Sequence, residues 1–277
     1  MSKQKVGVIH PGQMGLVVAE SMRNSGHEVC WASAGRSAET QRRAAGAGLT
    51  DAGSMAQLCE DCAALVSVCP PEFAEEVARE VAGLSFRGLY VDANAISPER
   101  TRRIGRLLTQ RGGTFVDGCI IGMPARTRGE TWLYVSGEQA EDVLPLFTGG
   151  PLEIEVLADE IGQASALKMC FAAQSKGSTA LLAAVMGAAE ALGVQGALER
   201  QWARSGPKFE SAVAAIRGAG PKAWRFRAEM KEIADTFESV GVPEGFPLAA
   251  AEIYEKLVEF KGGALPELST VLKRLRE

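Results

Sequence analysis

Two glycines close to the N-terminus have the spacing of a turn that binds phosphate groups. The stretch "VGVIHPGQMG" (residues 6–15) reads as a short buried strand, a turn and the start of a helix. In a G-x-G-x-x-G turn the glycines allow a tight bend, and the amides at the helix N-terminus stabilise a pyrophosphate. Gly12 and Gly15 occupy the second and third glycine positions, and His10 replaces the first. The stretch predicts a dinucleotide site, with a purely structural turn as the alternative. Its predicted cofactor-binding residues are His10, Pro11, Gly12, Gln13 and Met14.

The end of the next strand favours NADP over NAD. An NAD site normally has an acid there, whose carboxylate binds the ribose hydroxyls. This chain instead has "WASAGRSAET", in which Ser33, Arg36 and Ser37 precede the first acid, Glu39. A guanidinium and two hydroxyl groups suit the 2′-phosphate of NADP or NADPH. The alternative is a solvated arginine at the start of a helix.

Histidine and cysteine offer little further chemistry. The chain has two histidines, and His27 lies in a polar turn where we expect its side chain to be solvated. Cys59 and Cys62 form a C-x-x-C on an expected helix, but neither a second pair nor a nearby histidine accompanies them. We therefore predict structural thiols and no metal site. Acid–base chemistry would fall to lysine, an acid, tyrosine or cysteine.

The elements that must position these residues divide the chain in two. Strand and helix patterns alternate over roughly the first 155 residues, which predicts a doubly wound, mainly parallel sheet. Beyond this point the pattern is helical, and the expected helices cover 162–192, 196–217, 221–240, 247–261 and 265–276. We therefore predict an α/β Rossmann-type N-terminal domain (1–160) and an all-α C-terminal domain (161–277).

The bulk properties are those of an ordinary soluble protein. The 277 residues are 46% hydrophobic and 23% charged, with a net charge of −4, which favours neither nucleic acid nor an anionic membrane as a partner. No apolar run is long enough to span a bilayer, and the N-terminus lacks a signal peptide pattern. We expect a cytoplasmic location. The long helix, rich in small residues, favours a homodimer formed through the helical domain.

Four stretches resemble, in order and spacing, motifs of the β-hydroxyacid dehydrogenase family within the 6-phosphogluconate dehydrogenase-like superfamily. They are "GVIHPGQMG", "VDANAISP" (91–98), "FVDGCIIGMPARTRGETWLYVSG" (115–137) and "GQASALKMCFAA" (162–173). The variants "HPG-x-M-G" and "DANAISP" resemble a divergent, less characterised bacterial branch. The resemblance covers nearly the whole chain. It implies a Rossmann domain, a helical dimerisation domain and, in the cleft between them, an active site for a small molecule.

The resemblance also implies roles for individual residues. Lys168 matches the catalytic lysine of the family, and a desolvated lysine there would exchange a proton with a hydroxyl or amine. Asn94 matches a position near nicotinamide and substrate, so it is the second candidate catalytic residue. Further cofactor contacts are implied for Cys69, Pro70 and Pro71 and, by a looser match, for Lys231, for which a surface lysine is the alternative.

The chain departs from the family where a substrate would bind. Ile121 and Met123, on either side of Gly122, replace a serine and a glycine of the family motif. Phe171 and Ala172, which follow Lys168, replace its two asparagines. With Lys168, these are the predicted substrate-binding residues. Their apolar character predicts a substrate that is bulkier or less polar than a short 3-hydroxy acid.

Three functions are compatible with these residues. The first is an NADP-dependent oxidoreductase for a β-hydroxy acid or related hydroxy compound, in which Lys168 moves the hydroxyl proton. The second is an NADPH-dependent imine reductase, which Asn94 and an apolar cleft would suit but which the lysine argues against. The third is a non-enzymatic cofactor-binding protein, in which Lys168 would be dispensable.

Overall fold

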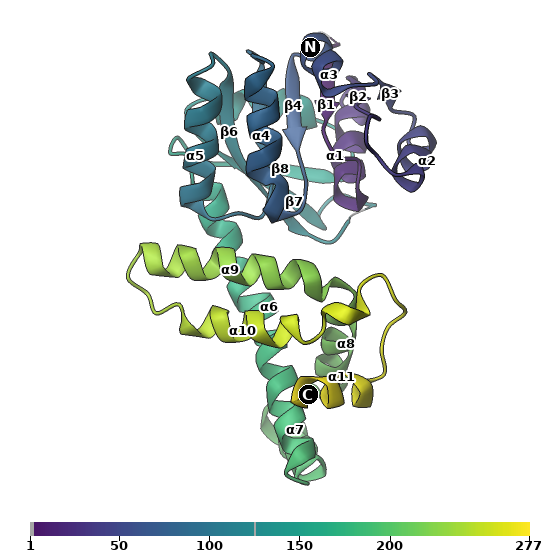
Figure 1. The fold of residues 1–277 in the computed structure, drawn as a ribbon, viewed down its shortest axis with the longest axis vertical. Coiled ribbons are helices and arrows are strands. Elements are labelled where there is room, and N and C mark those ends of the chain that lie inside the picture. The colour runs from purple at the N-terminus through teal and green to yellow at the C-terminus, as the bar shows by residue number, and fades with distance from the viewer. Residues whose placement is uncertain (1–2, 125) are drawn as a thin grey trace. The chain divides into compact units, whose positions relative to one another are not determined.

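A computed structural model describes residues 3–124 and 126–277. The chain divides into two compact units, Met1–Lys168 and Met169–Glu277 (Figure 1). The division falls inside the long helix α6 (Gln163–Ala191), because the first turn of this helix is hydrogen-bonded to the sheet of the first unit.

The first unit contains an eight-stranded sheet with the order β3-β2-β1-β4-β5-β6-β7-β8. All neighbouring strands are parallel except β6 and β7, which confirms the predicted Rossmann-type, mainly parallel sheet. The strand order reverses between β1 and β4, the place where such sheets bind ligands. The strands are β1 (Lys5–Val8), β2 (Glu28–Trp31), β3 (Thr50–Asp51), β4 (Ala64–Ser67), β5 (Leu89–Asp92), β6 (Thr114–Gly122), β7 (Thr131–Ser136) and β8 (Leu152–Ala158).

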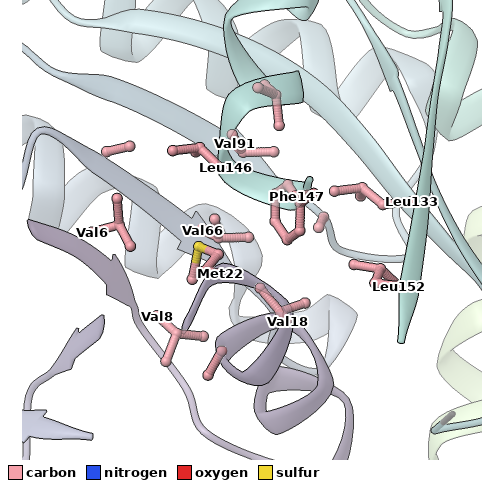
Figure 2. Packing of buried hydrophobic residues seen from close by; sticks show 14 of the residues in the cluster. Val6, Val8, Val18, Met22, Val66, Val91, Leu133, Leu146, Phe147 and Leu152 are labelled. Carbon is pink, nitrogen blue, oxygen red and sulfur yellow. The ribbon is translucent and has the colours of Figure 1, made fainter. Parts of the chain in front are cut away.

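Helices cover both faces of this sheet, which is why its central strands are apolar on both sides. On one face, Val18 and Met22 of α1 and Phe147 of η2 pack on Val66 of β4 and Leu133 of β7 (Figure 2). On the other face, a second buried cluster joins the sheet to α3, α4 and α5. The helices of this unit are α1 (Gln13–Asn24), α2 (Ala38–Gly46), α3 (Met55–Asp61), α4 (Ala74–Gly83), α5 (Pro98–Thr109) and the 3₁₀ segments η1 (Pro71–Phe73) and η2 (Ala140–Phe147).

The second unit is helical, as expected. Figure 1 shows α9 and α10 side by side. Phe226 of α9 packs edge-on against Tyr254 of α10, with 5.4 Å between the ring centroids. After α6 come α7 (Gln195–Ser205), α8 (Phe209–Ala219), η3 (Gly220–Lys222), α9 (Ala223–Ser239), α10 (Gly245–Glu255), η4 (Val258–Phe260) and α11 (Leu268–Arg276). The single helix predicted over 196–217 is wrong. Gly206 and Pro207 separate α7 from α8, since proline removes a backbone donor and glycine is a weak helix former.

The predictions of a solvated His27 and of a helix shared by Cys59 and Cys62 are wrong. His27 is buried rather than solvated, and its Nε2 lies 3.1 Å from the carbonyl oxygen of Pro145, because η2 covers the turn that carries it. Cys62 does not share a helix with Cys59, since α3 ends at Asp61 and Cys62 has an extended backbone. Its thiol is hydrogen-bonded to Cys30 instead.

Among the residues that the structure describes, no helix is both long enough and apolar enough to cross a membrane.

Candidate functional site

The turn between β1 and α1 is tight and leads directly into the first turn of a helix. The Gly12 amide donates to the carbonyl of His10 at 2.8 Å, and Gly12 is the residue that precedes the first turn of α1. A Cβ on Gly15 would overlap the carbonyl oxygen of His10, so only glycine fits there. By contrast, a Cβ on Gly12 would have no atom of the described residues within 4 Å. The space beside the helix N-terminus is open, which fits the close approach of a pyrophosphate.

Two buried side-chain nitrogen atoms near this turn, Nδ1 of His10 and Nε of Arg36, have no hydrogen-bond partner within the described parts of the chain. Burial and then the charge of Arg36 lower the pKa of His10 to about 4, so the imidazole is neutral at pH 7. Burial and then the charge of Asp92 raise the pKa of the Cys69 thiol to about 12, and Arg36 is the smallest of the causes that act to lower it. The Nε–H of Arg36 is a donor, an unsatisfied buried donor is costly, and an anionic group would satisfy it.

An acid that the sequence analysis missed lies beside the end of β2. Asp51 ends β3, and its Oδ1 accepts hydrogen bonds from the amides of Ser33 at 3.2 Å and Gly53 at 2.7 Å. Burial acts to raise the pKa of Asp51, but the hydrogen bonds from Ser33 and Gly53 lower it overall. The pairing of Trp31 with Asp51 brings this acid to Ser33. Ser37 has a structural partner too, because its hydroxyl accepts from the Thr40 amide at the start of α2. Arg36 has backbone hydrogen bonds with Ser33 and Gln41, but among the described residues its buried side-chain Nε has no partner.

Asn94 joins the ends of β4 and β5. Its Oδ1 accepts from the Cys69 amide at 2.6 Å, and its Nδ2 donates to the Ser67 hydroxyl at 3.1 Å. The residue is buried, and its own amide donates to Oδ1 of Asp92 at 3.0 Å. These contacts give Asn94 a positioning role for the 68–71 loop, in which Pro71 is buried and Cys69 and Pro70 are half-buried. Its predicted contact with nicotinamide or substrate stays a prediction.

Lys168 lies one turn into α6 and contacts β6. Its Nζ donates to the carbonyl oxygen of Ile120 at 2.7 Å, and the side chain is half-buried. The next residues of β6 are the half-buried Ile121 and the exposed Gly122, which has a φ of 128° that favours glycine. Met123 follows with 66% of its surface exposed. The structure therefore places Lys168 beside the segment in which three of the predicted substrate-binding residues lie.

The other predicted residues lie in the second unit. Phe171 and Ala172 follow Lys168 on α6, where Phe171 is 46% exposed and Ala172 is buried. Lys231 is exposed on α9. The roles of these three residues stay predictions.

Two buried acids near the site were also missed by sequence reasoning. Asp92 and Asp117 occupy equivalent positions on β5 and β6, and both are buried. The signal was present in "LYVD" and "TFVD", where each buried strand carries an acid after two apolar residues. An acid at the carboxyl end of a central strand needs partners, and it therefore points to a structured turn beside it.

Two regions of the chain match known families. Residues 5–148 match the NAD binding domain of 6-phosphogluconate dehydrogenase. Residues 189–257 match a domain of unknown function, DUF1932. The first match spans strands β1 to β7 together with the turn at Gly12.

Individual relatives agree with this assignment. The conserved protein MTH1747, of unknown function and described as structurally similar to 3-hydroxyacid dehydrogenases, is 33% identical. The match covers 92% of this chain and 97% of that one, with a TM-score of 0.69. An uncharacterised 28.5 kDa protein of Methanothermus fervidus is 29% identical over 190 residues, which is 69% of this chain and 72% of that protein. The 3-hydroxyisobutyrate dehydrogenase of Salmonella typhimurium shares the fold, at 19% identity, a TM-score of 0.74, and coverage of 98% of this chain and 99% of that one.

Proposed function

This chain belongs to the family of the NAD binding domain of 6-phosphogluconate dehydrogenase, and we propose that it is an NADP-dependent oxidoreductase of hydroxy compounds. Membership supports the general class, an NAD(P)-dependent dehydrogenase or reductase. Our proposal adds three points: the preference for NADP, the class of substrate, and Lys168 as the group that transfers the proton.

The contact between Lys168 and Ile120 carries the proposal. It holds the ammonium group at 2.7 Å from the Ile120 carbonyl, beside the exposed Met123. An ammonium group has three N–H donors, so a lysine can contact a backbone carbonyl and a substrate oxygen at the same time. A bound nicotinamide supplies hydride exchange with the substrate carbon. Lys168 would accept the hydroxyl proton as a neutral amine during oxidation, and as the resulting ammonium it would return a proton during reduction.

The substrate we propose is a β-hydroxy acid or related hydroxy compound with a bulky apolar part. The structural likeness reported for MTH1747 supports a hydroxy acid. The exposed Met123 and Phe171 offer apolar surface to a side chain of the substrate. Ile121 and Gly122 complete the proposed substrate contacts, whereas the fully buried Ala172 offers no surface for one.

NADP is preferred in this proposal because Arg36 has an unsatisfied Nε and no acid follows it closely at the end of β2. A guanidinium group forms charge-assisted hydrogen bonds with a phosphate monoester. Cys69, Pro70, Pro71 and Lys231 would contribute further cofactor contacts.

We also propose a homodimer formed through the helical unit, in the cytoplasm. Leu181 of α6 is 53% exposed, and Leu192, just after this helix, is 75% exposed. Exposed large apolar side chains are typical of contact surfaces when they lie together on one element. Light scattering would measure the assembly, and a monomer of the wild-type chain would contradict the dimer.

The experiment that tests the proposed function is a turnover screen that follows the absorbance of the reduced nicotinamide. NADP is offered with short and bulky β-hydroxy acids, and NADPH with the corresponding ketones and with cyclic imines. Oxidation that depends on Lys168 is the expected result. Reduction of imines alone would replace the proposal with the imine reductase alternative. Tight NADPH binding without any turnover would favour a non-enzymatic role.

A further inference from the structure

Asp117 of β6 is a buried carboxylate that gathers donors from distant parts of the chain. Its Oδ2 accepts from the amides of Gly162 at 2.9 Å and Ser165 at 3.0 Å, and from the Ser136 hydroxyl at 3.0 Å. Its Oδ1 accepts from the Ser165 hydroxyl at 2.7 Å. The amides belong to the beginning of α6, where backbone donors lack partners within the helix. A carboxylate there satisfies them and also favours the positive end of the helix.

The neighbouring hydroxyl groups extend this network. The Ser136 hydroxyl accepts a hydrogen bond from the Ala164 amide at 3.0 Å, so a third donor at the start of α6 is satisfied. The Ser165 hydroxyl lies 2.7 Å from that of Thr101 on α5. The first turn of α6 is therefore held by β6, β7 and α5 together.

The same strand also contacts α6 through Lys168. Lys168 is three residues after Ser165, about one helical turn further along. Ile120, whose carbonyl oxygen accepts from Lys168 Nζ at 2.7 Å, is three residues after Asp117 on β6. β6 thus holds α6 at two successive points, once through a side chain and once through its backbone. The first contact fixes the rotation and register of the helix, and these decide whether Lys168 reaches Ile120.

We propose that Asp117 is the positioning residue of this site, because its carboxylate holds the first turn of α6 on β6 and so sets the place of Lys168 Nζ. The importance of this position rests on the proposed catalytic role of Lys168. The position itself can be measured without any substrate.

The test is the rate at which an acetylating N-hydroxysuccinimide ester modifies Lys168, measured by peptide mass spectrometry after short pulses. Asp117→Ala removes every acceptor and should raise this rate about tenfold, the factor that corresponds to losing one hydrogen bond to a charged group. The exposed Lys256 is the reference within each sample, and its rate should not change.

Two variants control for a general loss of structure. Asp92→Ala makes the same change at the equivalent, equally buried position of the neighbouring strand, where the carboxylate accepts from Asn94 and not from α6. It should leave the Lys168 rate unchanged. Asp117→Asn should restore the wild-type rate, because its oxygen can keep the three Oδ2 contacts while its NH₂ group donates to the Ser165 hydroxyl. If Asp117→Ala does not fold, Ser165→Ala removes the Oδ1 contact and the contact with the Thr101 hydroxyl but keeps the three Oδ2 contacts, so it should raise the rate less, in the same direction.

Equal Lys168 acetylation rates in the wild type and in the Asp117→Ala or Ser165→Ala protein would overturn the proposal, and so would an equal rise in Asp92→Ala.

Turnover supplies the second readout. Asp117→Ala should lower kcat about tenfold on the substrate found in the screen, with little change in KM for NADPH, because misplacing a reacting group affects the chemical step. If Lys168→Ala keeps its turnover, the proposed function fails, while the acetylation rates still decide whether Asp117 positions Lys168.

Discussion

Asp92 and Asp117 lie opposite each other on the parallel strands β5 and β6, and both carboxyl groups are buried. Each accepts hydrogen bonds from the segment that carries one candidate catalytic residue. Asp92 binds the amide of Asn94, and Asp117 binds the first turn of the helix that carries Lys168. Burial and, to a lesser extent, the charge of Asp117 raise the pKa of Asp92 to about 7, against the hydrogen bonds from Asn94. The two carboxyl groups therefore hold the segments of both candidate catalytic residues, and burial beside Asp117 destabilises the ionised form of Asp92.

The raised pKa of Asp92 predicts how the stability of the folded protein depends on pH. In the unfolded chain Asp92 has a pKa of 3.8, whereas in the folded chain it is about 7. Between these values the folded state keeps a proton that the unfolded state has lost, so the contribution of Asp92 to stability falls as the pH rises. Asp92→Asn removes this dependence. We expect its melting temperature, relative to the wild type, to rise by several degrees between about pH 5 and pH 8.

Differential scanning fluorimetry across that range measures the effect. Asp51→Asn is the control, since the pKa of Asp51 is lowered and its stabilising contribution is lost only under more acidic conditions. Parallel pH curves for the wild type and Asp92→Asn would contradict the raised pKa.

Gly12 and Gly15 should respond differently to the same substitution. Gly15→Ala places a Cβ against the carbonyl oxygen of His10, so it should destabilise the folded protein. Gly12→Ala places its Cβ in open space, so it should fold normally and lose affinity for the cofactor. Thermal melting and NADPH titration separate the two effects. A Gly12→Ala protein that binds NADPH as tightly as the wild type would show that the phosphate does not approach this turn.

Arg36 should discriminate between the two nicotinamide cofactors. Arg36→Ala should weaken NADPH binding about tenfold to a hundredfold, the range for a hydrogen bond between charged groups, and change NADH binding much less. Arg42→Ala, on the exposed face of α2, is the matched control. Calorimetric titration with both cofactors measures the difference. An equal loss for NADH would assign Arg36 to the pyrophosphate or to the structure of the turn.

The framework of the site was predictable from sequence because it depends on local patterns. The strand before Gly12, the helix after it and the long helix 163–191 all follow from apolar periodicity and turn residues. Strand β8 was not predicted individually, because its "LEIEVLA" residues are mostly half-buried and give a weak alternation. The split of 196–217 at Gly206 shows that a glycine–proline pair outweighs a continuous helical composition.

The contacts within the site were less predictable, because they join residues that are distant in sequence. Asp51 reaches Ser33 only through the pairing of β2 with β3. The tasks of Asn94 could not be read from "VDANAISP", since its partners Ser67 and Cys69 belong to another strand and loop. His10 illustrates the same limit. Its position in the turn was visible, but its lowered pKa depends on burial and on Arg36, which follows a different strand.

Lys168 should be required for turnover and dispensable for binding the cofactor. Lys168→Ala removes the Nζ group that contacts Ile120, so turnover should fall about 10²–10⁴-fold, the usual contribution of general acid–base catalysis, with NADPH affinity nearly unchanged. Lys168→Arg sharpens the test, because a guanidinium keeps the positive charge and the donors but does not release a proton at neutral pH. A proton-transfer role predicts that the arginine variant is nearly as inactive as the alanine variant. An arginine variant close to wild-type activity would mean that only the charge of Lys168 matters. Lys256→Ala, at an exposed position, should retain full turnover in the same assay and thus exclude a general effect of losing a lysine.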